Sequence, residues 1–456
     1  MKKIVLSLAG VMAAAAFAPE ASALPVFARQ TGMACSACHF QHFPLLNSFG
    51  RAFKAAGFTM VGAQGKIEGD RLSIPDTLNM AFLSSLGYVK SNQTADNSGA
   101  TKNPGNGGFY LPGIAGEASL FVGGRVSDFA GFLSEITLSG AAAIDSGKLA
   151  ILPEIGSSGI HAGLVPFATN GQGASYGFEY LNTGANAIHS ITNTVGDALN
   201  NPAAGTTNTA SGKNEFINAV SAQQYIGTAT AADGIAAVAN SDMGFVNVTK
   251  YNMSGMATGQ QGSLGSTYVR VAGLFDLAGW DSALGFQSWS GSSLNDGGGT
   301  LALAAVNQSK AWAIDGQMQG TLGEMPTGFY FSYANAPVAS AGQAVNAFNG
   351  GQLTRSSFNV DAEIGVIPEV ATIGAAIRRA KSGVDAGFAN TGVANGSNAS
   401  DNAIFLTATY KVAQNMLARL SYVKQSGDYW TLVNGTGTNA SATGDTVYAV
   451  NMYVLF

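Results

Sequence analysis

The chain has 456 residues, of which only 11% are charged and 60 are glycine, and its formal net charge is −5. Soluble globular chains carry roughly 25% charged residues, so this composition argues against a set of ordinary soluble domains. The acidic balance also argues against nucleic acid as a partner, because phosphate backbones are bound by an excess of lysine and arginine.

The first 23 residues have the three parts of a secretory signal peptide. Two lysines precede an apolar run from Ile4 to Ala18, and Ala21-Ser22-Ala23 provides small residues at the cleavage position. We therefore expect residues 1–23 to be removed on export, with Leu24 as the first residue of the mature protein. Beyond this point the sequence has no run of about 18 apolar residues, the length that a membrane-spanning helix needs.

The next stretch, "TGMACSACHFQHFP", contains both cysteines of the chain, Cys35 and Cys38, followed directly by His39. In a Cys-x-x-Cys-His motif the two thiols add to the vinyl groups of haem, and the histidine binds the iron. Such haem attachment occurs after export, which agrees with a signal peptide. The sequence therefore predicts one covalently attached c-type haem on Cys35 and Cys38, with His39 as an axial ligand of the haem iron.

Three other uses of these cysteines fit less well. A structural zinc site needs four ligands, and the sequence nearby offers His39 and His42 but no second pair of cysteines. A thioredoxin-like redox pair belongs to a βαβ unit, which the flanking sequence does not suggest. A disulfide between residues this close would shut a very short loop and stabilise little.

The second axial ligand of the iron stays open at the sequence level. His42 follows His39 by three residues and shares its helical face, so we expect it near the haem edge or the pore and not on the iron. Met60 lies far enough along the chain to fold back onto the haem, and a methionine would raise the reduction potential. Other candidates are Met33, Met80 and an open or water-ligated site.

From residue 71 onward the sequence repeats an alternating segment, a short turn, a second alternating segment and a long polar stretch. Alternation with a period of two places successive side chains on opposite faces of a strand. In "FNVDAEIGV", Asn359, Asp361 and Glu363 share one face, and apolar residues from Phe358 to Ile364 share the other. Short turns are expected at Ser127-Asp128, at Leu277 to Asp281, at Ile367-Pro368-Glu369 and at Ala413-Gln414-Asn415.

Two observations favour a membrane barrel over a soluble β-sandwich, which would also alternate. Tight turns at one end and long polar loops at the other are typical of bacterial outer-membrane barrels. The sequence also ends in "TVYAVNMYVLF", a strand that presents apolar residues on one face and finishes with Phe456. We predict a mainly β fold, a transmembrane antiparallel β-barrel of about 16 strands, within about 14 to 18, with a small N-terminal helical c-type haem segment.

This interpretation divides the chain into a signal peptide at 1–23, a monohaem cytochrome c segment at 24–70 and an outer-membrane β-barrel at 71–456. Two stretches stay undecided: "IHAGLVPF" and "YGFEYLN" are strands or part of a long loop. The segment from Thr183 to Ala239 has no firm pattern and is expected to be an outer loop or a plug insertion. His161 and His189 are expected to be surface or lumen residues. The predicted location is the bacterial outer membrane.

The segment from Pro25 to Met60 resembles the fused cytochrome and porin proteins of the outer membrane, the monohaem iron(II) oxidases of iron-oxidising bacteria. One departure is the insertion of Phe40-Gln41-His42 before Phe43-Pro44, where the family spacing is usually shorter. It leaves open a branch whose electron donor is not iron. The residues that carry the resemblance are Phe27 to Met33, Cys35, Cys38, His39, Phe43-Pro44, Asn47, Phe49-Gly50-Arg51, Phe53-Lys54 and Gly57.

The resemblance implies electron transfer at the outer membrane, from an extracellular donor such as iron(II), by way of one haem, to a periplasmic c-type cytochrome or other carrier. It leaves open an iron(II):cytochrome c oxidoreductase activity and assigns no catalytic residue. By the same resemblance, Arg29, Arg51 and Lys54 are expected to face the haem propionates. Asp361 and Glu363 would attract a cation or simply hydrate the pore wall. Two alternatives stay open, a diffusion porin whose haem segment is a plug or a sensor, and a redox protein for a small organic or sulfur donor.

Overall fold

The computed structural model describes most of the chain from residue 25 onward. The predicted signal peptide, Leu24, His189 and the greater part of the long polar loops lie outside the described residues. Within the described residues, no helix is long and apolar enough to cross a bilayer. The described ranges are 25–62, 64–70, 72–91, 107–113, 115–138, 143–185, 221–253, 263–294, 306–339, 345–387, 394–431 and 446–456.

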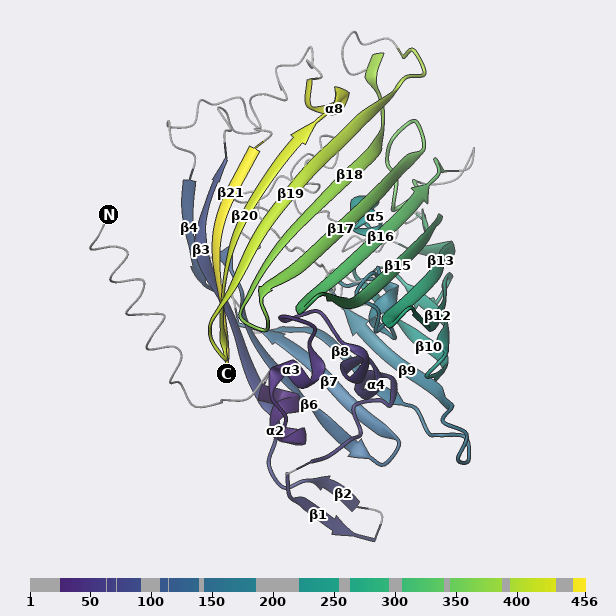
Figure 1. Ribbon diagram of the computed structural model, residues 1–456. Helices are drawn as coiled ribbons and strands as arrows, with labels where there is room; N and C mark the ends of the chain where they lie inside the picture. The colour runs from purple at the N-terminus through teal and green to yellow at the C-terminus, as the bar shows by residue number, and fades with distance from the viewer. Residues whose placement is uncertain are drawn as a thin grey trace, which may run out of the picture.

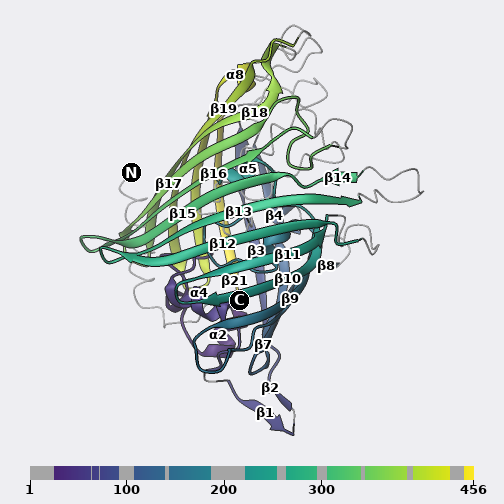
Figure 2. The same cartoon turned by 90° about the vertical axis from the view of Figure 1, so that its right-hand side faces the viewer.

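Sixteen antiparallel strands of the described residues close into a barrel, which confirms the predicted fold (Figures 1 and 2). Strands that follow each other in the chain are neighbours in the wall, and a seam between β21 and β3 completes the ring. The wall strands are β3 Met80–Ser91, β6 Ala118–Ser127, β7 Ala130–Thr137, β8 Ala143–Ile151, β9 His161–Thr169, β10 Ala232–Ser241, β11 Gly244–Asn252, β12 Ser266–Leu277, β13 Trp280–Leu294, β15 Ala311–Leu322, β16 Met325–Ala336, β17 Arg355–Ile367, β18 Ala371–Asp385, β19 Asn398–Ala413, β20 Met416–Ser426 and β21 Thr446–Leu455.

Three short strands extend this wall. β4 Gly107–Pro112 and β5 Ala115–Gly116 precede β6, and β4 pairs with the upper part of β3, whose lower part pairs with β6. β14 Val306–Gln308 precedes β15 and pairs with β13, as β15 does. Each of these short strands therefore continues the wall strand that follows it in the chain.

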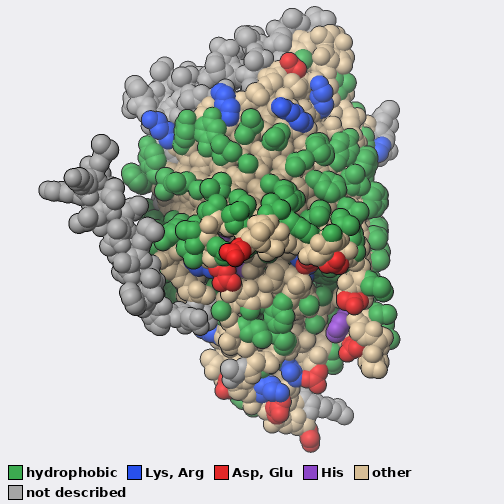
Figure 3. Space-filling model, viewed as in Figure 1, with side chains coloured by type: hydrophobic (Ala, Val, Ile, Leu, Met, Phe, Trp, Pro, Cys, Tyr) green, Lys and Arg blue, Asp and Glu red, His purple; other side chains and the backbone are tan. Residues whose placement is uncertain are grey.

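The two faces of the wall differ as the alternation predicts. On β17, Asn359, Asp361 and Glu363 are buried toward the lumen, whereas Phe358 and Val360 are exposed on the outside. Figure 3 shows hydrophobic side chains spread over the outer face. Lipid offers no hydrogen bonds, and a closed barrel leaves no unpaired strand edge. A closed barrel with an apolar outer face and a polar lumen is the architecture of a membrane-spanning β-barrel, in agreement with the predicted outer-membrane location.

The N-terminal segment lies at the barrel end that carries the short turns (Figure 1). It contains three helices, α2 Pro25–Thr31, α3 Cys35–Cys38 and α4 Ser48–Ala55. An exposed hairpin of β1 Lys66–Gly69 and β2 Leu72–Pro75 follows, before the wall begins at β3. The predicted domain boundary at residue 71 falls between the two strands of this hairpin.

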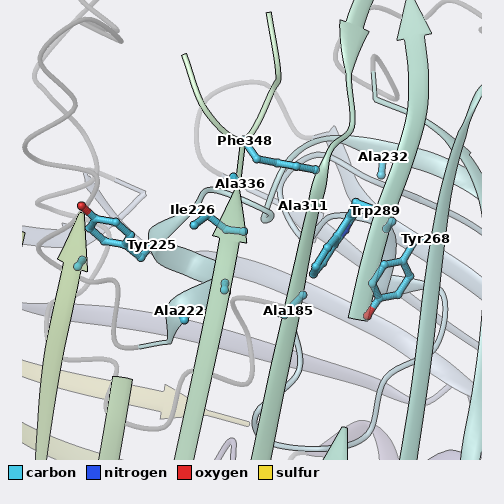
Figure 4. Close-up of a cluster of buried hydrophobic side chains, with 14 of the residues drawn as sticks. Ala185, Ala222, Tyr225, Ile226, Ala232, Tyr268, Trp289, Ala311, Ala336 and Phe348 are labelled. Atoms are coloured by element: carbon cyan, nitrogen blue, oxygen red, sulfur yellow. The ribbon is translucent and has the colours of Figure 1, made fainter. Parts of the chain in front are cut away.

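The connection between β9 and β10 enters the lumen. Its described parts contain a 3-10 turn η1, Ala174–Tyr176, and a helix α5, Ala222–Tyr225, and most of their side chains are buried. Figure 4 shows Tyr225 and Ile226 of this connection among buried side chains of the wall. "IHAGLVPF" is therefore strand β9, whereas "YGFEYLN" is not a strand but a buried part of this insertion. A last helix, α8 Asp428–Thr431, follows β20.

Buried charges of the wall fasten the insertion. The Arg270 guanidinium of β12 donates to Glu179 of the insertion at 2.9 Å and to Asp315 of β15. The Thr183 hydroxyl donates to the same Asp315 carboxylate at 2.6 Å. Tyr225 reaches the Asp401 carboxylate of β19 at 3.2 Å. The polar lumen therefore holds the insertion by charge-assisted hydrogen bonds.

Candidate functional site

Asn47 joins α3, the helix that carries the two cysteines, to α4. Its Oδ1 accepts from the Gly50 N–H at 2.9 Å and so caps α4, while its Nδ2 donates to the carbonyls of Ser36 and Ala37 in α3. A Cβ at Gly50 would lie 2.1 Å from the Cys38 carbonyl oxygen. Glycine is therefore needed for α4 to approach α3 this closely.

The thiols of Cys35 and Cys38 lie on the single turn of α3, and they form no disulfide. His39 follows, with Nδ1 3.0 Å from the Leu45 carbonyl oxygen. Because a carbonyl only accepts, Nδ1 carries the proton and Nε2 keeps its lone pair. Burial lowers the pKa of His39 to about 4, so that the imidazole is neutral near pH 7. This is the form in which histidine binds a metal.

An apolar cavity borders on Cys38 and His39. Its volume is about 150 Å³, and it is open on one side. Met33 and Lys54 also border it. Two thiols one turn apart, a neutral imidazole and a large aromatic lining fit a c-type haem. The apolar lining consists mainly of Phe27, Phe43, Leu46, Phe53, Phe58 and Leu133, the last from wall strand β7.

A second, much smaller cavity, of about 40 Å³, also borders on His39 and Phe43. Its other side is formed by the wall, including Lys411, Met416 and Leu455, near the turn between β19 and β20. The Cys35 thiol is 3.9 Å from a backbone carbonyl of that turn. The imidazole of His39 therefore lies at the boundary between two spaces, one mainly within the N-terminal segment and one against the wall.

The three basic residues expected near the propionates occupy different places. Lys54 borders the apolar cavity, and burial lowers its pKa to about 8 although Glu179 opposes the shift. The Arg51 guanidinium forms an ion pair with Asp281 and a 3.0 Å hydrogen bond to a wall glutamine. Arg29 is exposed and donates to a backbone carbonyl of β3. The roles of Arg29 and Arg51 stay predictions, and the geometry favours Lys54.

The methionines also separate. Met33 borders the apolar cavity that His39 borders, whereas Met60 packs against the cluster that contains Phe53 and Phe58. Met80 is the first residue of wall strand β3. Met33 is therefore better placed than Met60 or Met80 to approach a haem in this cavity. The identity of the second axial ligand stays a prediction.

His42 contacts the barrel wall. Its Nε2 is 2.5 Å from Glu363 Oε1 on β17, and both side chains are almost completely buried. Glu363 also accepts from the Thr372 hydroxyl at 2.7 Å. His42 and Glu363 were each singled out in the sequence, but their contact was not predicted, since it joins residues more than three hundred positions apart.

A third cavity, of about 480 Å³, lies between α4 and the short turns of the wall. Its lining is mixed, with apolar side chains beside the polar and charged residues Arg51, His161, Asp242, Asp276 and Asp281. His161 is thus a residue of this mouth, at the start of β9. The cavity is a recess beside the N-terminal segment.

Two residues near the site carried no functional prediction in the sequence. Asn182 of the insertion hydrogen-bonds to Leu46 of the N-terminal segment, and Lys148 of β8 lies against Phe58. The alternation around "SGKLAI" places Lys148 on the lumen side with Ser146 and Ala150, and a lysine on that face is the signal that was available. Asn182 offered no comparable signal.

Comparison with known proteins finds similar structures only among other β-barrels. No family model matches the chain, and no curated protein matches it. Similar solved structures include Pseudomonas putida OprB (12% identity, TM-score 0.49, covering 82% of this chain and 94% of that one) and the outer membrane channel DcaP of Acinetobacter baumannii (11%, 0.47, 83% and 97%). Salmonella typhi OmpF in complex with daunomycin has 12% identity and a TM-score of 0.46, and the match covers 86% of this chain and 100% of that one. Values this low carry no inference about function.

Proposed function

We propose that this protein is an outer-membrane electron-transfer protein of the cytochrome–porin type, which moves electrons from an extracellular donor, iron(II) by resemblance, to a periplasmic carrier. The observation that supports it is the Cys-x-x-Cys-His turn beside an apolar cavity in the mouth of a closed barrel. One covalently bound c-type haem would supply the one-electron redox chemistry. Lipid insulates, so a redox group is needed within the membrane protein itself.

The chain's own residues would hold this group in defined ways. Each thiol of Cys35 and Cys38 adds across one vinyl group, with its sulfur bonding to one carbon and its hydrogen passing to the other, so no oxidant is consumed. His39 offers Nε2 to the iron while the Leu45 carbonyl fixes its orientation. The aromatic lining excludes water, and Lys54 provides a positive charge at the edge of the cavity.

The short turns suggest the charge of the periplasmic partner. Six of the seven described turns carry an exposed carboxylate, and Figure 3 shows acidic side chains along this rim. Such a rim steers a soluble carrier with a basic face toward the mouth that holds the N-terminal segment. The six residues are Asp128, Glu154, Asp242, Asp276, Glu324 and Glu369.

The test uses the full chain, produced with the haem-attachment machinery and purified in detergent. Covalent haem should survive denaturing electrophoresis, and iron(II) should reduce the oxidised protein. Cys35→Ala and Cys38→Ala should reduce covalent haem while the barrel still assembles, and Ser36→Ala on the same turn is the matched control. A purified wild-type protein without covalent haem would overturn the proposal. Haem that iron(II) does not reduce would exclude iron and leave a non-iron donor.

The second candidate is a diffusion porin whose haem segment is a plug or a sensor. The recess of about 480 Å³ beside α4 favours it, because several charged side chains line it and it could admit water and small solutes at the mouth. The insertion that occupies the lumen favours electron transfer instead. Solute flux through liposomes containing the protein, together with a haem that no donor reduces, would support the porin.

A further inference from the structure

Lys148 is a buried cation of the barrel wall beside the apolar cavity. The residue is 5% exposed, and its Nζ donates to the Tyr176 carbonyl at 2.8 Å. Nζ is also 4.2 Å from the centroid of the Tyr176 ring and 6.0 Å from that of Phe58. None of the ion pairs among the described residues includes Lys148. Because a buried ammonium group is costly without a nearby negative charge, this position calls for an anion.

Lys54 provides a second ammonium group at the cavity. It projects from α4, is half-buried and borders the cavity, as Phe58 beside Lys148 also does. Leu133, which pairs with Lys148 across β7 and β8, lines the cavity on the wall side. One cation thus borders the apolar space directly, and the other lies behind two of its lining residues, Phe58 and Leu133. This arrangement suits an anion attached to an apolar ring system.

We propose that Lys148, together with Lys54, binds a propionate carboxylate of the covalently attached haem, so that the barrel wall holds the cofactor as well as the N-terminal segment does. The inference rests on the proposed function, which supplies the carboxylate. A purely structural Lys148 would instead serve only to hold the Tyr176 carbonyl. The two roles differ in what they predict for the reduction potential.

The experiment is a spectroelectrochemical titration of the purified full-length protein, after covalent haem has been confirmed. Removing a positive charge beside the haem favours the oxidised form. Lys148→Met should therefore lower the equilibrium constant for reduction about three- to tenfold, which is about 28 to 59 mV for one electron. Lys54→Met should also lower the reduction potential. Lys148→Arg keeps the charge and should leave the potential within twofold of the wild type.

Two lysines serve as controls. Lys250 on β11 is exposed on the outer face, so Lys250→Met should leave the reduction potential unchanged.

Lys411 borders the second cavity. A larger shift of the potential for Lys411→Met than for Lys148→Met would place the carboxylates beside that second cavity and overturn the inference. An unchanged reduction potential in Lys148→Met would also overturn the inference. So would a reduction potential that falls as far in Lys148→Arg as in Lys148→Met. Lys148→Gln provides a second neutral variant if Lys148→Met does not assemble. Wild-type protein without haem would instead refute the proposed function.

Discussion

Asn182 and Leu46 exchange two hydrogen bonds. The Leu46 N–H donates to Asn182 Oδ1 at 2.8 Å, and Asn182 Nδ2 donates to the Leu46 carbonyl at 2.9 Å. The backbone N–H of Asn182 is itself held by Gln317 of β15 at 2.8 Å. One side chain of the lumen insertion therefore pairs with the backbone of the N-terminal segment in the way that a strand would. Leu45, whose carbonyl orients His39, is the adjacent residue.

Asn182→Ala should loosen the N-terminal segment. The substitution leaves both backbone groups of Leu46 without this partner, and each lost hydrogen bond costs about 0.5–1.5 kcal/mol. We expect faster hydrogen exchange of the amides in residues 39–55, with no change in the strands of the wall. Asn170→Ala is the matched control, because Asn170 is exposed and its side chain donates to Asp145, away from the N-terminal segment. Equal exchange in the two variants would contradict the link.

Glu363→Ala should detach His42 from the wall. The substitution removes the buried acceptor of the 2.5 Å contact, and a lost hydrogen bond to a charged group costs about 1.5–3 kcal/mol. Limited proteolysis should cut the segment between His39 and Leu46 faster than in the wild type. Glu369→Ala, in the exposed turn after β17, should leave the cleavage rate unchanged. An uncut segment in Glu363→Ala would show that other contacts suffice.

Gly50→Ala should lower the yield of covalent haem. The added methyl group would lie 2.1 Å from the Cys38 carbonyl oxygen, so α4 must move away from the helix that carries the thiols. Overpacking of this kind costs about 1–3 kcal/mol. The measurement is the haem-to-protein ratio of purified barrels. Gly69→Ala, where a new Cβ would meet nothing within 4 Å, provides the comparison. A normal ratio in Gly50→Ala would mean that the helices can separate without loss.

Lys54 should make the docking of the haem-free segment depend on pH. Its pKa is about 8 in the folded protein against 10.5 ordinarily. Below pH 8 both states carry the charge, and the folded state bears the cost of burying it. Between about pH 8 and 10.5 the folded state releases its proton first, so docking becomes more stable as pH rises, by about 3 kcal/mol in all. Above that range the dependence ends.

This dependence can be measured in a Cys35→Ser, Cys38→Ser protein by urea titration at a series of pH values. At each urea concentration and pH, the hydrogen exchange rate of the α4 amides reports how stably the segment is docked, after correction for the intrinsic exchange rate at that pH. Adding Lys54→Met should remove the rise between about pH 8 and 10.5. A rise of the same size in the Lys54→Met protein would assign the effect to another group.

The acidic turns should control the rate of electron delivery to a soluble carrier. Replacing Glu324 and Glu369 by glutamine should slow reduction of a basic c-type cytochrome roughly two- to tenfold at low ionic strength. The difference should shrink as salt rises toward 0.15 M, where the Debye length is about 8 Å. An acidic carrier is the control, and it should react no more slowly with the variant. A salt-independent loss would point to structural damage.

The barrel could be predicted from the sequence because lipid and lumen impose opposite demands on alternate residues. Phe358 and Asn359 show this, the first exposed to the outside and the second buried in the lumen. The Cys-x-x-Cys-His motif could be read in the same way, because haem attachment requires residue types at a fixed local spacing, and the haem itself stays a prediction. Both signals are contained within a few consecutive residues.

The lumen insertion could not be predicted in the same way. In "YGFEYLN" the aromatic residues Tyr176, Phe178 and Tyr180 alternate as they would in a strand, but the residues on both sides of the alternation are buried. What holds them inside is Arg270, which bonds Glu179 from a distant strand. The contacts of His42 and Lys148 likewise depend on which distant elements meet, and local spacing carries no record of that.

The shared cavity has a consequence for how this protein could be re-engineered. The N-terminal segment, residues 24–70, can bury only a marginal core of its own, since even a domain of about 60 residues is only marginally stable. Phe53 and Phe58 complete their packing against Ala150 and Leu152 of the wall side. The segment is thus not a transferable module. Grafted onto another scaffold, it would lose the part of its hydrophobic enclosure that Ala150 and Leu152 provide.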